Sequence, residues 1–254
     1  DADYTRLRLV KSPAEVAWLR AGARMSDAAV AALAAAARPG ASEAECLAAL
    51  ESAYIPAGGQ THIHYLGVTS MARPRLCVPA QWPASRRLAP GDVLTCEVSA
   101  SYGGYPGQLL RTFAVDSEPA PLYRELHEVA EAAFGAMSAR LRPGARASDL
   151  VTAAGVITDA GYTIYDDLVH GYGGGYLPPV IPRSALESGA AADFTFAAGM
   201  TVVLQPNVIT RDELAGVQTG ELMLVTDTGC ESLHAFPRGF RQTGPLSPGI
   251  PAGR

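Results

Sequence analysis

The sequence predicts a single α+β domain made of two copies of one unit, each with two helices followed by strands. The run R-P-G-A at residues 38–41 recurs at 142–145, each time between two helical segments. The run before a strand at 88–94 has a counterpart at 196–202, at nearly the same offset. R-P-G-A alone is a common helix-ending turn in an alanine-rich chain. Two pairs of runs together favour duplication, with two curved half-sheets around a central site.

The first copy begins with two helices. Ser12 can cap a helix, Pro13 fits its first position, and Glu15 completes a capping box, so a helix is predicted to about residue 37. The R-P-G-A run ends this helix. Ser42 and Glu45 form a second capping box, and the helix that follows is predicted to extend to about residue 54.

Strands follow the helices in each copy. Between residues 63 and 113, short apolar and β-branched stretches are separated by Gly and Pro, which predicts antiparallel strands. The clearest are 93–100 and 109–115. Helical patterns return at 121–141 and 148–160, and strands resume from 163 to 226.

Composition excludes several function classes. Lys and Arg number 20 against 25 Asp and Glu, with no basic run, so no nucleic-acid partner is expected. The longest apolar run, 28–37, is about half of the roughly 20 residues that a membrane-spanning helix needs, so no membrane partner is expected. The 4 cysteines form no C-x-x-C pair, which favours a reducing compartment. The charged N-terminus has no apolar signal core, so we expect a cytoplasmic protein.

Five motifs occur in order along the chain. They are LAPGDVL at 88–94, YGGY at 102–105, RTF at 111–113, AGMTVV at 198–203 and LMLVTDTG at 222–229. Together they resemble the creatinase, prolidase and aminopeptidase P superfamily. The resemblance covers residues 8 to 240 and implies the pita-bread fold, one domain over 1–254, and a homodimer. Residues 7–15 resemble the linker to an N-terminal domain in larger members, so 1–11 are expected to be such a linker.

The resemblance also bears on metal binding, because the family's metallopeptidases hold two divalent ions through two Asp, one His and two Glu. Two adjacent metal ions need several anionic oxygen ligands. Matching the motifs places the ligand positions on Glu97, Gln108, Gly174, Gln205 and Gly220, with an assisting histidine on Ala80. A shifted alignment would make His170 the ligand instead of Gly174. We therefore expect no metal and no cofactor.

The internal repeat supports the same expectation. Glu97 follows Gly91 by six residues, and Gln205 follows Gly199 by six. The same strand position of each half is thus predicted to face the centre, as an acid in one half and an amide in the other. An amide keeps the hydrogen bonding of a carboxylate but removes its charge and a preferred ligand of hard cations.

Three residues are candidate catalytic groups. His170 precedes a glycine-rich turn, where the backbone can approach a ligand closely; the alternative is an ordinary loop histidine. Glu97 is a buried acid on a predicted core strand and needs a partner, whereas Cys96 beside it should point to the opposite face. Arg111 could be that partner or could form a structural ion pair. Glu221, directly after Gly220, is the third candidate.

The candidate substrate-binding residues are histidines, tyrosines and polar strand residues. If residues 61–65 are extended, His62 and His64 share one face and could act as a pair, although both could equally be structural. Tyrosines near the glycine-rich turn could line a pocket. The full set is His62, His64, Tyr105, Gln108, Arg111, Tyr172 and Gln205, with Tyr176 as a further pocket residue.

Creatinase itself lacks the metal set and hydrolyses a C–N bond through histidine and glutamate side chains. This chain resembles that branch in having few ligands. We predict a metal-independent enzyme that cleaves or rearranges a C–N bond in a small amino-acid-derived or guanidino-type molecule. Two alternatives stay open. One is a catalytically inactive module that binds a peptide or protein, and the other is an Xaa-Pro-type metallopeptidase with an atypical metal site.

Overall fold

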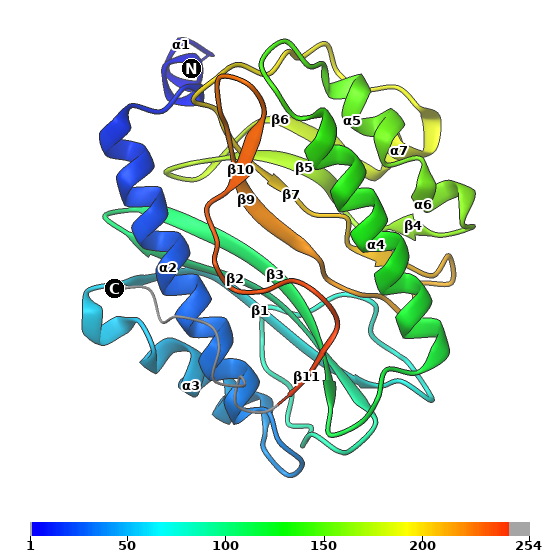
Figure 1. Ribbon diagram of the computed structural model, residues 1–254. Coiled ribbons are helices and arrows are strands. Elements are labelled where there is room, and N and C mark those ends of the chain that lie inside the picture. Colours follow the sequence, from blue (N-terminus) through cyan, green and yellow to red (C-terminus); the bar gives the residue numbers. More distant parts are fainter. Residues whose placement is uncertain (1, 244–254) are drawn as a thin grey trace.

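The centre of the fold is a curved, mainly antiparallel sheet (Figure 1), seen in a computed structural model that describes residues 2–243. The strand order is β1-β2-β3-β9-β7-β5-β6, with β10 paired to β9 and β11 to β3; β4 and β8 form a separate pair. The strands are β1 (Gln60–Ser70), β2 (Asp92–Tyr102), β3 (Tyr105–Val115), β4 (Thr163–Ile164), β5 (Asp167–Tyr172), β6 (Tyr176–Pro182), β7 (Thr201–Leu204), β8 (Val208–Ile209), β9 (Gly220–Val225), β10 (Cys230–Ser232) and β11 (Arg241–Gln242).

The predicted capping boxes begin the two helices of the first half, α2 (Pro13–Ala36) and α3 (Glu43–Ser52). Helix α2 packs closely on β2 and β3 because glycines meet at the contact. A Cβ atom on Gly107 would lie 2.3 Å from Cα of Ala23. The Ser26 hydroxyl donates to the Gly107 carbonyl and accepts from the Ala100 amide at 2.9 Å. Only small residues allow this approach of helix and sheet.

The second half repeats the arrangement with α4 (Pro121–Arg140), α5 (Ala147–Ala153) and α6 (Val156–Asp159). The single helix predicted at 148–160 is divided, because the backbone tightens at Ala154 and Gly155. A short helix, α7 (Arg183–Ser188), also interrupts the region where only strands were predicted. Its 6 residues are too few to give a clear helical pattern.

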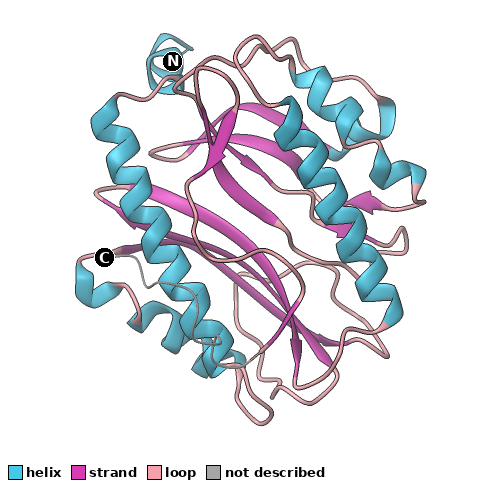
Figure 2. Ribbon diagram, viewed as in Figure 1, coloured by secondary structure: helices cyan, strands magenta, loops and turns pink. Residues whose placement is uncertain are grey.

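Helices α2 and α4 lie on the same side of the sheet, and the chain after β9 runs between them (Figures 1 and 2). Two main apolar clusters fill the space beneath these helices. One joins α4 to the β5, β7 and β9 half, and the other joins α2 and α3 to β1, β2 and β3. The predicted duplicated α+β architecture is confirmed. We call the helix-covered side the outer face and the opposite side the inner face.

Residues 2–9, inside the predicted linker, form helix α1 (Ala2–Leu9), and η1 (Ile55–Ala57) follows α3. The Arg8 side chain donates to the carbonyl oxygens of Gly173 (3.1 Å) and Gly174, in the β5–β6 turn. Helix α1 is thus tied to the glycine-rich turn. Within residues 2–243, no helix is long and apolar enough to cross a membrane.

Strand β2 separates its side chains between the two faces. Cys96 is fully buried in the outer-face cluster with Leu66, its partner on β1. Glu97, paired with Tyr65 of β1, therefore points to the inner face. The prediction that Cys96 and Glu97 face opposite ways is confirmed, and the burial of Cys96 raises the pKa of its thiol to about 12.

Candidate functional site

A chain of side-chain hydrogen bonds crosses the inner face and joins the two halves of the fold. Gln108 of β3 donates from Nε2 to Oε1 of Glu97 at 2.7 Å and to Oε1 of Gln205 at 3.1 Å. Gln205, directly after β7, donates from its own Nε2 to the Asp167 carbonyl at 3.1 Å. The equivalent positions predicted to face the centre, Glu97 and Gln205, are thus linked through Gln108.

Glu97 is mainly neutral in this environment. Burial, followed by the negative charges of Asp166 and Asp167, raises its pKa to about 8. Because Gln108 donates to Oε1, the protonated carboxyl keeps a hydrogen that it can donate to a ligand. Burial also raises the pKa of Asp167 to about 6, although a hydrogen bond from the Tyr176 hydroxyl opposes the shift.

His170 lies next to this chain on β5. It has no exposed surface, and burial lowers its pKa to about 4, so the imidazole is neutral near pH 7. Its ring stacks on Tyr176 with centroids 3.9 Å apart, and the Gln205 amide lies beside it. Nδ1 lies 3.2 Å from the Gly171 carbonyl oxygen and donates to it, whereas Nε2 has no partner that meets hydrogen-bond geometry in the described part of the chain. Nε2 is therefore free to accept a proton or a hydrogen bond.

Tyr172 and His62 complete the aromatic side of the site. The Tyr172 ring packs edge-on against His170 (5.2 Å) and against His62 (5.8 Å). Its buried hydroxyl and that of Ser99 have no partner meeting hydrogen-bond geometry within residues 2–243. The structure thus brings Glu97, Gln108, His170, Tyr172, Tyr176 and Gln205 together, with His62 at the edge.

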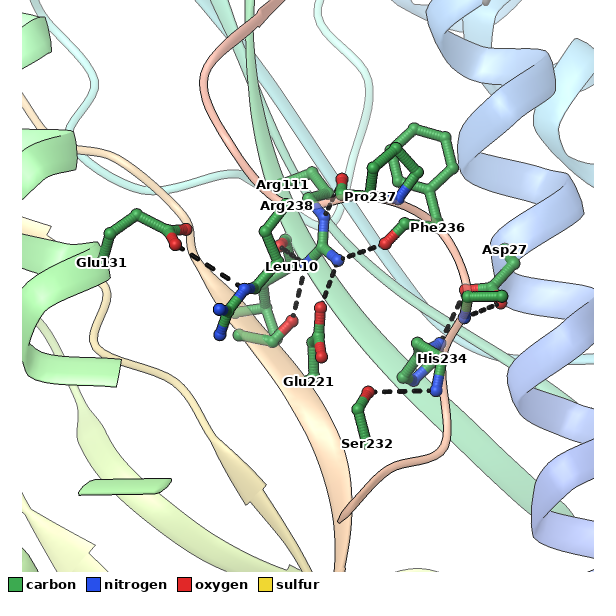
Figure 3. A network of polar contacts seen from close by, with 12 residues as sticks. Asp27, Leu110, Arg111, Glu131, Glu221, Ser232, His234, Phe236, Pro237 and Arg238 are labelled. Atoms are coloured by element: carbon green, nitrogen blue, oxygen red, sulfur yellow. Dashed lines mark hydrogen bonds and ion pairs between the residues drawn. The ribbon is translucent and has the colours of Figure 1, made fainter. Parts of the chain in front are cut away.

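Arg111 and Glu221 lie elsewhere, on the outer face (Figure 3). The Arg111 guanidinium pairs with Glu221 and donates to the carbonyl oxygens of Gly220 (3.1 Å) and Phe236 (2.8 Å). Of the two roles considered for Arg111, the structural ion pair is the one formed. Glu221 is one residue beyond Gly220, and a step of one residue along a strand reverses the face. The proposed grouping of Glu221 with Glu97 and His170 is therefore absent.

His64 and Tyr105 also contact residues away from the site. The register of β1 shifts between Thr61 and Ile63, so His62 and His64 do not share a face, contrary to the prediction for an extended segment. His64 is buried, with Nε2 2.7 Å from the Tyr54 hydroxyl and Nδ1 accepting from the Ser99 amide at 3.3 Å. Tyr105 donates to Glu15 at 3.0 Å. These contacts indicate structural roles.

Four residues of the site were not predicted from the sequence: Asp166, Asp167, Tyr65 and Asn207. Asn207 is 2% exposed and donates from Nδ2 to Oδ1 of Asp166 at 2.6 Å. Tyr65 lies close enough to Glu97 and Asp166 for both charges to raise the pKa of its hydroxyl, after the larger effect of burial. The signal available in the sequence was the pair of adjacent acids, Asp166 and Asp167, where the strand that carries His170 begins.

Comparison with known proteins identifies the family. The chain matches metallopeptidase family M24 over residues 17–227 and belongs to that family. It is 28% identical over 244 residues to a putative dipeptidase, YkvY, of Bacillus subtilis, covering 92% of this chain and 62% of the relative. It is 28% identical over 237 residues to the probable dipeptidase PepE of Mycobacterium tuberculosis, covering 91% and 60%. The chain thus spans less than two thirds of these relatives.

Solved structures agree with this assignment. Dipeptidase PepE from Mycobacterium ulcerans superimposes with a TM-score of 0.82 at 25% identity, over 94% of this chain and 62% of that one. Prolidase from Pyrococcus furiosus superimposes with a TM-score of 0.82 at 23% identity, over 94% of this chain and 68% of the prolidase chain. Methionine aminopeptidase from Rickettsia prowazekii superimposes with a TM-score of 0.75 at 17% identity, over 88% of this chain and 98% of the aminopeptidase chain. The resemblance to the prolidase and aminopeptidase P superfamily, and its pita-bread fold, are confirmed.

The side chains present do not fit the two-metal centre of the family's metallopeptidases. Among residues 2–243, no group of three or more His, Cys, Asp or Glu side chains is placed to hold a metal ion. The amides of Gln108 and Gln205 instead bond to each other. At Gly220 a Cβ atom would come within 2.7 Å of the Leu204 carbonyl oxygen, so a ligating side chain has no room.

Proposed function

We propose that this chain is a metal-independent hydrolase of C–N bonds in small amino-acid-derived or short peptide substrates. The observation that carries the proposal is the Glu97–Gln108–Gln205 chain, which stands where the family's anionic ligands align. The dipeptidase relatives support a peptide-like C–N bond as the target.

The site contains one group that can donate a proton and one that can accept a proton. At neutral pH, Glu97 is mainly a proton donor and His170 a proton acceptor. In the proposed reaction a water oxygen bonds to the carbon of the C–N bond, and the proton it loses passes to His170 Nε2. The C–N bond then breaks, and the leaving nitrogen takes the proton of Glu97. Each such transfer typically contributes about 10²–10⁴-fold in rate.

The test is release of amine from alanyl-proline, alaninamide and guanidinoacetate by the purified chain, before and after treatment with a chelator. We expect turnover of at least one compound that the chelator leaves unchanged. Glu97→Gln should reduce the rate by about 10²-fold or more, and so should His170→Asn. Glu128→Gln, an exposed carboxyl on α4, is the matched control and should retain full activity.

The other outcomes contradict the proposal in different ways. Loss of turnover on chelation, with recovery on adding manganese, would assign the reaction to a metallopeptidase with an atypical site. Binding of these compounds without turnover would favour the non-catalytic binding module.

A further inference from the structure

We infer that Asp166, Asp167 and Asn207 form a subsite for a positively charged nitrogen group of the substrate, an ammonium or a guanidinium. The role of this subsite in catalysis rests on the proposed function, whereas its binding of a cation does not depend on hydrolysis.

The subsite adjoins the hydrogen-bonded chain. The carbonyl of Asp167 accepts from Gln205, which accepts in turn from Gln108. Asp166, the preceding residue, is exposed, whereas Asp167 is partly buried at the start of β5. A substrate group held by these two carboxylates would therefore be next to Glu97.

In the part of the chain that the structure describes, the carboxyl groups here have no cationic partner. Among residues 2–243 no ion pair involves Glu97, Asp166 or Asp167. Arg183 of α7 donates its amide hydrogen to the Asp166 carbonyl at 2.7 Å, but its side chain pairs with Glu187 and Glu213 instead. Grouped acids of this kind repel one another, and a bound cation relieves that repulsion.

Unpaired acceptors point independently to a ligand rich in donors. Nδ2 of Asn207 donates to Asp166, which fixes the orientation of the amide and leaves Oδ1 as an acceptor. Oδ1 is buried and has no partner in the described residues, and the same holds for Nε2 of His170. A buried acceptor without a donor is costly, and an ammonium or guanidinium supplies several donors.

The aromatic rings at the subsite are also compatible with a cation. Tyr176 is 51% exposed, donates its hydroxyl hydrogen to Asp167, and stacks on His170. Tyr65 lies near Glu97 and Asp166. Aromatic faces attract cations, and a planar guanidinium can also bond a carboxylate through two N–H groups.

The test is calorimetric binding at neutral pH and low ionic strength, using two pairs of probes of nearly equal shape. Butylguanidinium is compared with neutral butylurea, and protonated alaninamide with neutral lactamide. We expect each cation to bind at least tenfold more tightly than its neutral partner, and added salt to weaken only the cations. The stronger cation identifies guanidinium or ammonium as the natural group.

The Asp166→Asn/Asp167→Asn variant should reduce cation affinity at least tenfold. Asparagine can still accept the hydrogen bonds from Asn207 and Tyr176, so folding should persist. If the double variant does not fold, the exposed Asp166→Asn alone serves the same test with a smaller loss. Asp227→Asn, an exposed acid in the turn after β9, is the control for loss of charge.

Equal affinity for the charged and neutral probes would overturn the inference, as would unchanged cation binding in the folded variants. Tight cation binding by a chain that hydrolyses nothing would support this inference and contradict the proposed function. Hydrolysis that does not depend on substrate charge, with no selective cation binding, would support the proposed function and contradict this inference.

Discussion

Gln108 donates to the Glu97 carboxyl at 2.7 Å, where the family's metallopeptidases place two acidic metal ligands. The second N–H of the same amide is directed to Gln205 at 3.1 Å. Both donors of the amide are therefore used within the protein. This arrangement provides at most one negative charge, that of Glu97. A site for two divalent ions needs several anionic oxygen ligands.

The raised pKa of Glu97 predicts a pH-dependent stability. Its pKa is about 8 in the folded chain against an ordinary value of 4.5, so the folded state holds the proton more strongly. Stability of the wild-type chain should therefore fall as the pH rises from about 4.5 to about 8. Glu97→Gln cannot ionise and its Oε1 can still accept from Gln108. The variant should be more stable than wild type above pH 8, by on the order of 2 kcal/mol.

The measurement is thermal unfolding of both chains across this pH range. The difference between them should vanish near pH 4 and reach roughly 5 °C in alkaline buffer. Glu128→Gln should follow wild type throughout. A constant difference at every pH would mean that Glu97 ionises normally.

We expect the chain to bind no stoichiometric amount of a divalent metal ion. Protein purified without chelator, then incubated with manganese, cobalt or zinc and desalted, should contain far less than one ion per chain by elemental mass spectrometry. The reason is the absence, within residues 2–243, of a three-residue ligand group. Chelators should likewise leave the melting temperature unchanged. One bound ion per chain that disappears in Glu97→Ala would refute the non-metal assignment.

The Arg111–Glu221 pair should matter for stability. Each side chain is nearly buried, and the guanidinium also holds the carbonyl oxygens of Gly220 and Phe236. Arg111→Ala leaves a buried carboxylate unpaired and should lower the free energy of unfolding by about 3–5 kcal/mol. Urea unfolding measures this loss. If Glu221→Gln removed activity with no change in stability, Glu221 would instead have a role in the reaction.

The order of elements could be predicted from the sequence because the signals are local. Capping boxes at Ser12 and Ser42 begin the helices where expected, and both of the clearest strands lie within β2 and β3. The equivalence of Glu97 and Gln205 also emerged from the repeat, and a hydrogen-bonded chain joins the two residues. Local pattern and duplication are sufficient for these features.

The rest of the site depends on contacts between distant segments. Whether Arg111 reaches Glu97 or Glu221 depends on how β3 and β9 pair, and the sequence does not specify that register. The register shift at Thr61–Ile63 places His62 and His64 on opposite faces of the sheet, and no residue type in this segment indicates the shift. Asp166 and Asn207 meet only because β5 and the chain after β7 adjoin. Each case is a tertiary effect that overrides a local pattern.

The two histidines of β1 should respond differently to substitution. His64 is buried and bonded to Tyr54 and to the Ser99 amide, so His64→Leu should cost about 1–3 kcal/mol, because each of these groups loses a hydrogen bond and the Tyr54 hydroxyl keeps only its bond to Thr61. His62 is exposed and packs edge-on against the Tyr172 ring, so His62→Leu should change stability by less than about 0.5 kcal/mol. Denaturant unfolding of the two variants compares them directly. Equal losses would mean that the irregularity in β1 does not separate the histidines.

The contact between α2 and β3 gives a prediction that depends on a single carbon atom. In Gly107→Ala the new Cβ would lie 2.3 Å from Cα of Ala23, and backbone on both sides prevents easy relief. We expect a loss of about 3 kcal/mol or more in the free energy of unfolding. Gly135→Ala is the matched control, because Gly135 lies within α4 with no atom within 4 Å of the new Cβ. There alanine should raise stability by about 0.5–1 kcal/mol through its better helix propensity. Opposite signs for the same substitution would support close packing of α2 on the sheet; a neutral Gly107→Ala would show that helix and sheet are farther apart.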